Sequence, residues 1–111
     1  QDAAHYNYAH ISLDDPAKQN VHNGVFHVFG GERVRISSLE GGPGLLPTNE
    51  WTPVKLVWDG KTGELRVWAN GKTTEALHAV DLSLKHGRVG VGSFNETGSF
   101  RNLKVNGVAV K

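Results

Sequence analysis

Glycine and proline interrupt this chain so often that no long helix fits between them. The sequence of 111 residues contains 14 glycines and 4 prolines, and no segment carries a helical stripe of apolar residues over three turns. Short runs rich in β-branched and aromatic residues lie between the turn signals. This pattern predicts strands at residues 6–13, 24–29, 33–38, 52–59, 64–70, 73–78, 88–94 and 100–106. Many short strands joined by turns are typical of a β-sandwich.

Residues 87–107 contain the clearest strand–turn–strand pattern. Val89 and Val91 alternate with glycines, and a second apolar run begins at Phe100. Period-two alternation bounded by Asn and Gly is typical of two strands joined by a turn. The Asn70-Gly71 pair predicts a tight hairpin that leads directly into residues 72–77.

The middle of the chain places an aromatic and a basic residue on one strand face. Alternation puts Arg66 and Trp68 opposite the apolar positions of their predicted strand. A tryptophan beside an arginine is a candidate contact for a sugar or a protein. If a loop such as residues 41–47 covers Trp68, its role is structural instead.

The first predicted strand carries a second candidate surface. Tyr6, Tyr8 and His10 project from one of its faces. Tyrosine rings stack on the C–H faces of sugars, and imidazole or hydroxyl groups bond sugar hydroxyls. The alternative is that the rings belong to the core. His10 or His22, the latter beside Asn23, is either a polar or acid–base group in a cleft or a structural histidine at a turn.

Composition argues against several classes of function. The formal net charge is +1 and the basic residues are scattered, so no strong field for nucleic acid exists. The chain has no cysteine, which excludes disulfides and thiolate metal sites. No apolar run is long enough to cross a membrane. These features fit one globular domain spanning residues 1–111.

Short motifs in a fixed order suggest a relationship. They are YAHIS at 8–12, RIS at 35–37, WTPVKLV at 51–57, GELRVW at 63–68, GRVGVGSF at 87–94 and FRNLKV at 100–105. This order resembles the concanavalin A-like lectin/glucanase superfamily, within it the bacterial 3-keto-disaccharide hydrolase-type domains, with laminin G-like modules as near relatives. The resemblance implies an all-β jelly-roll β-sandwich of antiparallel strands. The match begins near Tyr6, so we expect this chain to be the C-terminal portion of a larger jelly roll, lacking some N-terminal strands.

The resemblance also bears on mechanism and metals. The Glu-x-Asp-x-x-Glu strand of the β-glucanase branch is absent here, so its retaining mechanism does not carry over. We expect no cofactor; calcium, known in the superfamily, is the alternative, with oxygens from Asp14, Asp15, Asn95 and Glu96. The histidines show no zinc-site spacing.

Three functions remain open at this point. The first is a carbohydrate-recognition or accessory module of a secreted or periplasmic bacterial protein, with ligand contacts at Tyr6, Tyr8, His10, His22, Asn23, Arg66 and Trp68. The second is a glycoside hydrolase of the 3-keto-disaccharide type, with catalytic candidates His10, His22 and Asp15. The third is a structural protein-interaction module. An uncovered strand edge would favour a homo-oligomer or a second chain that completes the sandwich.

Overall fold

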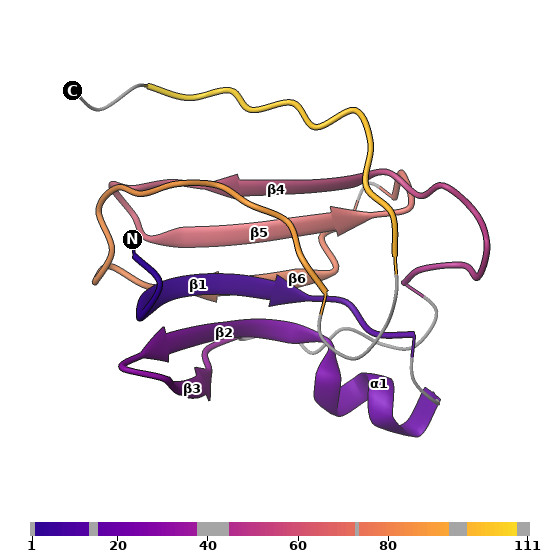
Figure 1. Ribbon diagram of the computed structural model, residues 1–111, viewed down its shortest axis with the longest axis horizontal. Coiled ribbons are helices and arrows are strands. Elements are labelled where there is room, and N and C mark those ends of the chain that lie inside the picture. Colours follow the sequence, from indigo (N-terminus) through magenta and orange to yellow (C-terminus); the bar gives the residue numbers. More distant parts are fainter. Residues whose placement is uncertain (1, 14–15, 38–44, 73, 94–97, 109–111) are drawn as a thin grey trace.

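The chain is mostly β and forms two antiparallel three-stranded sheets (Figure 1). The computed structural model describes residues 2–13, 16–37, 45–72, 74–93 and 98–108. The first sheet has the order β1 (His5–His10), β2 (Gly24–Phe29), β3 (Glu32–Arg35), and the second has the order β4 (Val54–Trp58), β5 (Glu64–Ala69), β6 (Leu77–Val80). The helix α1 (Pro16–His22) lies between β1 and β2 in the chain. This arrangement is compatible with the predicted all-β class.

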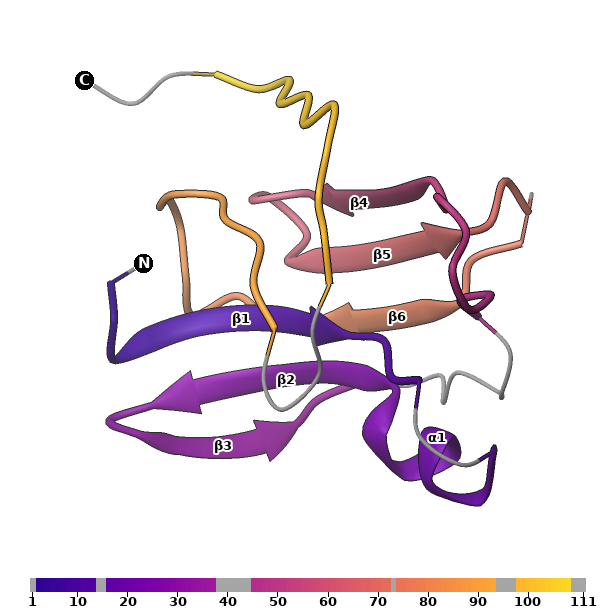
Figure 2. The same cartoon turned by 45° about the vertical axis from the view of Figure 1, so that its right-hand side comes forward.

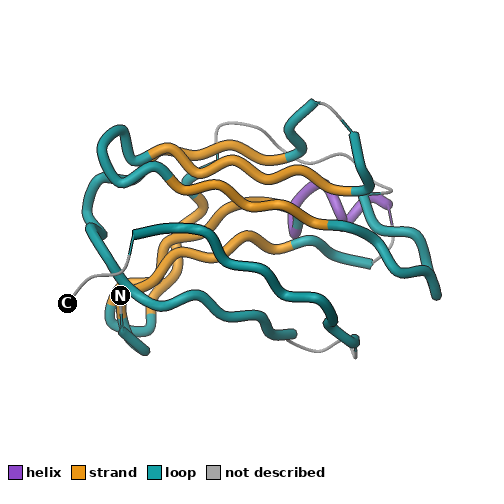
Figure 3. Tube along the Cα trace, turned by 90° about the horizontal axis from the view of Figure 1, so that it is seen from above, coloured by secondary structure: helices purple, strands orange, loops and turns teal. Residues whose placement is uncertain are grey.

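The two sheets share one apolar core. Val25 from β2 and Leu65, Val67, Leu77 and Ala79 from β5 and β6 are buried together. Strand pairing sets Leu65 against Ala79 and Val67 against Leu77, so these side chains point to the same face of the second sheet. Among the strands, β2 and β6 make the most extensive contact between the two sheets. Seen from above, α1 lies at one end of the strands (Figure 3).

The core stops short of β4. Pairing with β5 places Val54, Leu56 and Trp58 on the same face as Ala69, Val67 and Leu65, respectively. Yet Val54 is 53%, Leu56 49% and Trp58 37% exposed. The apolar face of the second sheet is therefore uncovered along this strand.

The turn at Asn70-Gly71 is present, but the tight hairpin predicted there is wrong, because the next strand starts later than predicted. Asn70 has φ 60° and Gly71 φ 67°, the left-handed pair that a primed turn requires. The strand predicted at residues 73–78 is instead β6, Leu77–Val80. The segment after the turn pairs with β5 only from Leu77 onward, where Leu77 lies opposite Val67.

The strands predicted at residues 88–94 and 100–106 are wrong for the part that the structure describes, since residues 81–93 and 98–108 contain no strand. A strand needs a neighbouring ladder for its backbone groups, and no ladder forms beside these segments. Gly90 and Gly92 also bring no side chain to pack, and Val89 is 68% and Val91 56% exposed. Residues 98–108, yellow in Figures 1 and 2, extend beyond β4.

The helix α1 was not predicted, because its seven residues are too few to show a helical apolar stripe. It begins at Pro16, and proline suits the first helical position because its fixed φ matches and its missing N–H is not needed there. α1 lies at the end of the first sheet where β1 ends and β2 begins (Figure 2).

Candidate functional site

The face of the first sheet that points away from the core carries a row of aromatic and basic side chains. Pairing sets Tyr6 opposite Val28 and Tyr8 opposite Phe26, and on the other side of β2 it sets Arg33 and Arg35 opposite the same two residues. Because side chains alternate along a strand, all of these share one face. We call this face the aromatic platform; it comprises Tyr6, Tyr8, His10, Phe26, Val28, Arg33 and Arg35.

The rings of the platform lie against one another. Tyr8 stacks on Phe26 with centroids 5.3 Å apart and an interplanar angle of 18°. Tyr6 follows at 6.0 Å from Tyr8, tilted by 39°. Val28, only 6% exposed, supports the row from within the sheet, whereas Tyr6 is 36% exposed. The platform thus offers an aromatic surface to solvent, and Tyr6 is the more exposed of its two tyrosines.

Two arginines stand over the same ring. The guanidinium carbon of Arg33 is 5.6 Å and that of Arg35 5.1 Å from the centroid of Phe26. Arg33 Nη1 also donates to the hydroxyl oxygen of Tyr8 at 3.1 Å. Cation–π attraction and this hydrogen bond fix positive charge at the edge of the aromatic row.

His10 and His22 lie at the α1 end of the platform. His10 Nδ1 donates to the carbonyl oxygen of His22 at 2.9 Å, and the two rings are 6.4 Å apart. Both side chains are partly exposed. The structure therefore brings Tyr6, Tyr8, His10 and His22 to one surface.

Asn23, predicted as a ligand contact, is fully buried at 0% exposure. Its Oδ1 accepts a hydrogen bond from Ser12 N at 2.6 Å, and its carbonyl oxygen accepts one from Arg35 Nη1 at 2.9 Å. Arg35 Nη2 donates to the carbonyl oxygen of Val21 as well. Asn23 and Arg35 therefore tie the end of α1 to the sheet beneath the platform, and Asn23 does not face solvent.

Arg66 and Trp68 lie elsewhere, on the outward face of the second sheet. There they line a hollow of about 300 Å³ together with Val57, Asp59, Thr62 and Glu64. Arg66 is paired with Glu64 at 2.5 Å and with Glu75 at 3.6 Å. Lys55 Nζ sits 5.3 Å from the Trp68 ring centroid. The predicted set of ligand contacts is thus divided between two sheets, and the loop expected to cover Trp68 lies mostly outside the described residues.

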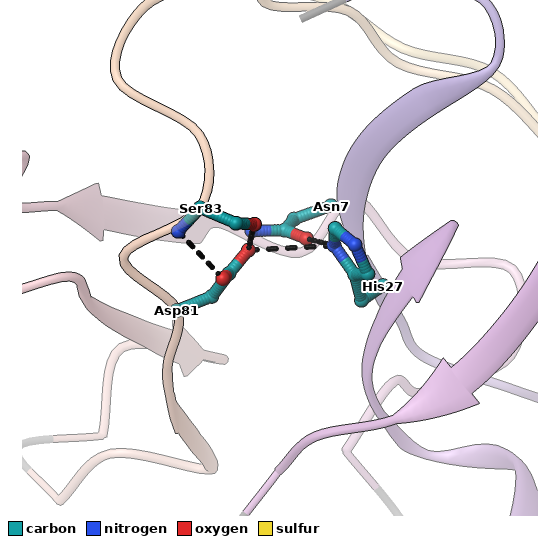
Figure 4. Close-up of polar contacts among 4 residues, drawn as sticks. All are labelled: Asn7, His27, Asp81 and Ser83. Atoms are coloured by element: carbon teal, nitrogen blue, oxygen red, sulfur yellow. Dashed lines mark hydrogen bonds and ion pairs between the residues drawn. The ribbon is translucent and has the colours of Figure 1, made fainter. Parts of the chain in front are cut away.

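A polar cluster that local sequence patterns do not predict lies between the sheets (Figure 4). Asp81, just after β6, accepts hydrogen bonds from Asn7 Nδ2 and from Ser83 Oγ, both at 2.9 Å, and its Oδ2 lies 3.3 Å from His27 Nδ1. His27 Nδ1 is also 2.7 Å from Asn7 Oδ1. The only sequence signal was the Asp-x-Ser spacing of a local turn, because Asn7 lies 74 residues away.

The environment of Asp81 keeps its carboxyl ionised. Burial would raise its pKa, but hydrogen bonds from the backbone and hydroxyl of Ser83 and from Asn7, together with the nearby His27, lower it below the ordinary value of 3.8. Its side chain is 15% and that of His27 21% exposed. The cluster joins β1 and β2 to the segment after β6, and we assign it a structural role.

The residues predicted as calcium ligands, and Asp15 as a catalytic candidate, are not described by the structure. Asp14, Asp15, Asn95 and Glu96 lie outside the described residues. Within the described ranges, no group of three or more metal-ligating side chains gathers. In that same part of the chain, helices are too short and too polar to cross a membrane.

Comparison with protein-family models, with curated proteins and with solved structures found no match to this chain.

Proposed function

We propose that this chain is a carbohydrate-recognition module whose binding surface is the aromatic platform. The supporting observation is the row of Tyr6, Tyr8 and Phe26 on one outward sheet face, with positive charge fixed at its edge. Pyranose rings present patches of C–H groups that stack on such rings, while their hydroxyls bond polar groups at the rim.

The rim of the platform supplies groups of the required chemistry. Arg33, Tyr8, His10 and His22 offer donors and acceptors around the rings. Val28 and the Tyr8–Phe26 stack hold the surface rigid, so little conformational entropy is lost on binding. In this proposal Asn23 and Arg35 act indirectly, by holding the end of α1.

The test is native mass spectrometry and isothermal titration calorimetry of the chain against a panel of neutral and acidic oligosaccharides. We expect adducts without cleavage. Binding should weaken by about tenfold in Tyr6→Ala, because a stacking contact on one aromatic ring is taken to contribute about 1.4 kcal/mol, the upper end of the range for aromatic pairs. Tyr6→Phe keeps the ring and should retain binding. Trp68→Ala, on the other sheet, is the matched control. Binding lost in Trp68→Ala and kept in Tyr6→Ala would move the site to the second sheet.

Fold and context are part of the proposal. The two antiparallel sheets around one core, open along β4, support a concanavalin A-like jelly roll completed by further strands. The resemblance of the motifs supports a place in a secreted or periplasmic bacterial protein. The hydrolase alternative requires a carboxylate beside His10 or His22, and cleaved products in the same experiment would favour it over a binding module.

A second candidate function, assembly with a second copy of this chain, is favoured by β4. Val54, Leu56 and Trp58 point to the core side of their sheet but remain open. The same chain exposes alternating apolar side chains at Val89 and Val91 without a strand partner within the described residues. Each copy would thus bring both an open strand and a segment able to pair with it.

Sedimentation velocity tests this assembly. We expect a dimer that Leu56→Lys disrupts, because the lysine would lie in the covered face. Val57→Lys, on the opposite face of β4, is the matched control. A monomer at all concentrations would contradict the assembly role and would leave the proposed carbohydrate binding at the aromatic platform unaffected.

A further inference from the structure

The arginine at the edge of the aromatic platform is held in place by contacts that leave its charge unneutralised. Arg33 donates from Nη1 to the hydroxyl of Tyr8 at 3.1 Å and stands 5.6 Å from the Phe26 ring centroid. A guanidinium carries five N–H donors. In the described part of the chain, the Tyr8 hydroxyl is its hydrogen-bond acceptor and no carboxylate pairs with it. Arg33 is exposed, so its remaining donors face solvent.

The other arginines of the two sheets are used differently. Arg66 is neutralised by Glu64 and Glu75. Arg35 donates to the backbone carbonyls of Val21 and Asn23 and to the hydroxyl of Ser37. Its donors therefore serve the fold.

The rest of the platform carries no negative charge. Its members are aromatic, aliphatic or basic, and no Asp or Glu is among them. Alternation along β3 turns Glu32, next to Arg33 in the chain, towards the opposite face. An anion arriving at the platform would therefore meet attraction at Arg33 with no carboxylate of the platform opposing it.

We propose that the platform selects acidic saccharides, and that Arg33 recognises their anionic group. The planar guanidinium matches the two oxygens of a carboxylate or a sulfate ester bidentately, which a lysine does not. The sugar ring carrying that group would lie over Tyr8 and Tyr6, within reach of the Arg33 side chain that Tyr8 already contacts. This inference rests on the proposed carbohydrate function and names its class of ligand.

Titration calorimetry at low salt tests the proposal with matched probes. The probes are galacturonate and mannuronate tetrasaccharides, their neutral galactose and mannose counterparts, and a sulfated galactan tetrasaccharide. We expect at least one acidic probe to bind about tenfold more tightly than its neutral counterpart, the scale of one charged hydrogen-bonded contact. The carboxylate and sulfate arms tell the two anion sources apart.

Variants assign the preference to one residue. Arg33→Gln should remove the preference for acidic saccharides. Arg33→Lys should retain only part of this preference, because the positive charge remains but the planar, two-donor geometry of the guanidinium is lost. Arg66→Gln, on the second sheet, is the control and should leave it unchanged. Added salt should weaken the preference in the wild type. Circular dichroism establishes that each variant is folded; Arg33 is exposed, so we expect no loss of fold.

The outcomes separate this inference from the function on which it rests. Equal binding of acidic and neutral probes, sensitive to Tyr6→Ala, overturns the acidic selectivity and leaves the carbohydrate function standing. A preference that survives in Arg33→Gln overturns the assignment to Arg33. Binding of no saccharide by the wild type overturns both.

Discussion

Removing the carboxylate of Asp81 should weaken the joint between the two sheets. Asp81→Ala deletes the acceptor of the bond from Asn7 Nδ2 and the ion-pair partner of His27. Both contacts link segments far apart in the chain, and the Asp81 side chain is only 15% exposed. A hydrogen bond to a charged group contributes about 1.5 to 3 kcal/mol. His27 Nδ1 lies closer to Asn7 Oδ1, at 2.7 Å, than to Asp81, so most of the expected loss of about 3 kcal/mol comes from the Asn7 bond. The bonds to Ser83 are local and exposed, and we expect them to add little.

Urea unfolding followed by circular dichroism measures this loss. With an m-value of about 1.5 kcal/mol per molar urea, the midpoint of unfolding should fall by about 2 M. Asp59→Ala is a matched control, because Asp59 accepts hydrogen bonds from Lys61 N and Thr62 N inside one exposed loop. The control should lower the midpoint far less.

A double-mutant cycle with Asn7→Ala then isolates the contact between the sheets. Coupling between Asp81 and Asn7 should approach 1 kcal/mol, since removing either partner leaves the other partly buried without its bond. Equal losses in Asp81→Ala and Asp59→Ala, with no coupling to Asn7, would refute the idea that this cluster joins the sheets.

Three further results follow from the described contacts. Since the pKa of Asp81 lies below 3.8 in the folded state, its contribution is complete above that pH and is lost as pH falls through the lowered pKa; acid titration of unfolding should show this loss in the wild type but not in Asp81→Asn. Leu77→Ala should cost about 3 kcal/mol in urea unfolding because Leu77 is fully buried, whereas Val80→Ala, at a 52% exposed position, should cost under about 0.5 kcal/mol. Gly63→Ala should lower the melting temperature more than Gly71→Ala: both have positive φ, but only the Cβ at Gly63 would lie 2.7 Å from the Asp81 carbonyl oxygen. Equal shifts for the two glycine variants would contradict that contact.

Features that depend on neighbours in the sequence were predictable. The spacing of Tyr6, Tyr8 and His10 placed them on one strand face, because alternation is a local property of any strand. The turn at Asn70-Gly71 was likewise predictable, because Asn and Gly readily adopt the positive φ angles that it requires.

Features that depend on partners far away were not predictable. The alternation around Val89 indicated a strand, but a strand forms only where a neighbour offers free backbone groups, and the described residues there have none. Asn23 resembled a polar surface residue in the sequence. In the structure it is buried and accepts hydrogen bonds from Ser12 and Arg35. Asp81 and Asn7 meet across the two sheets, which no short-range pattern encodes.

The two arginines above Phe26 separate two tasks that a single residue often combines. Arg35 spends its donors on backbone carbonyls, so its replacement would disturb the architecture. Arg33 donates one hydrogen bond to the hydroxyl of Tyr8, and its other N–H groups face solvent. With Arg33 as the proposed contact for an anionic group, substitution at this one position would change ligand selectivity and leave the scaffold beneath it intact. Under this proposal, position 33 is where protein engineering would alter the preferred ligand charge without redesigning the fold.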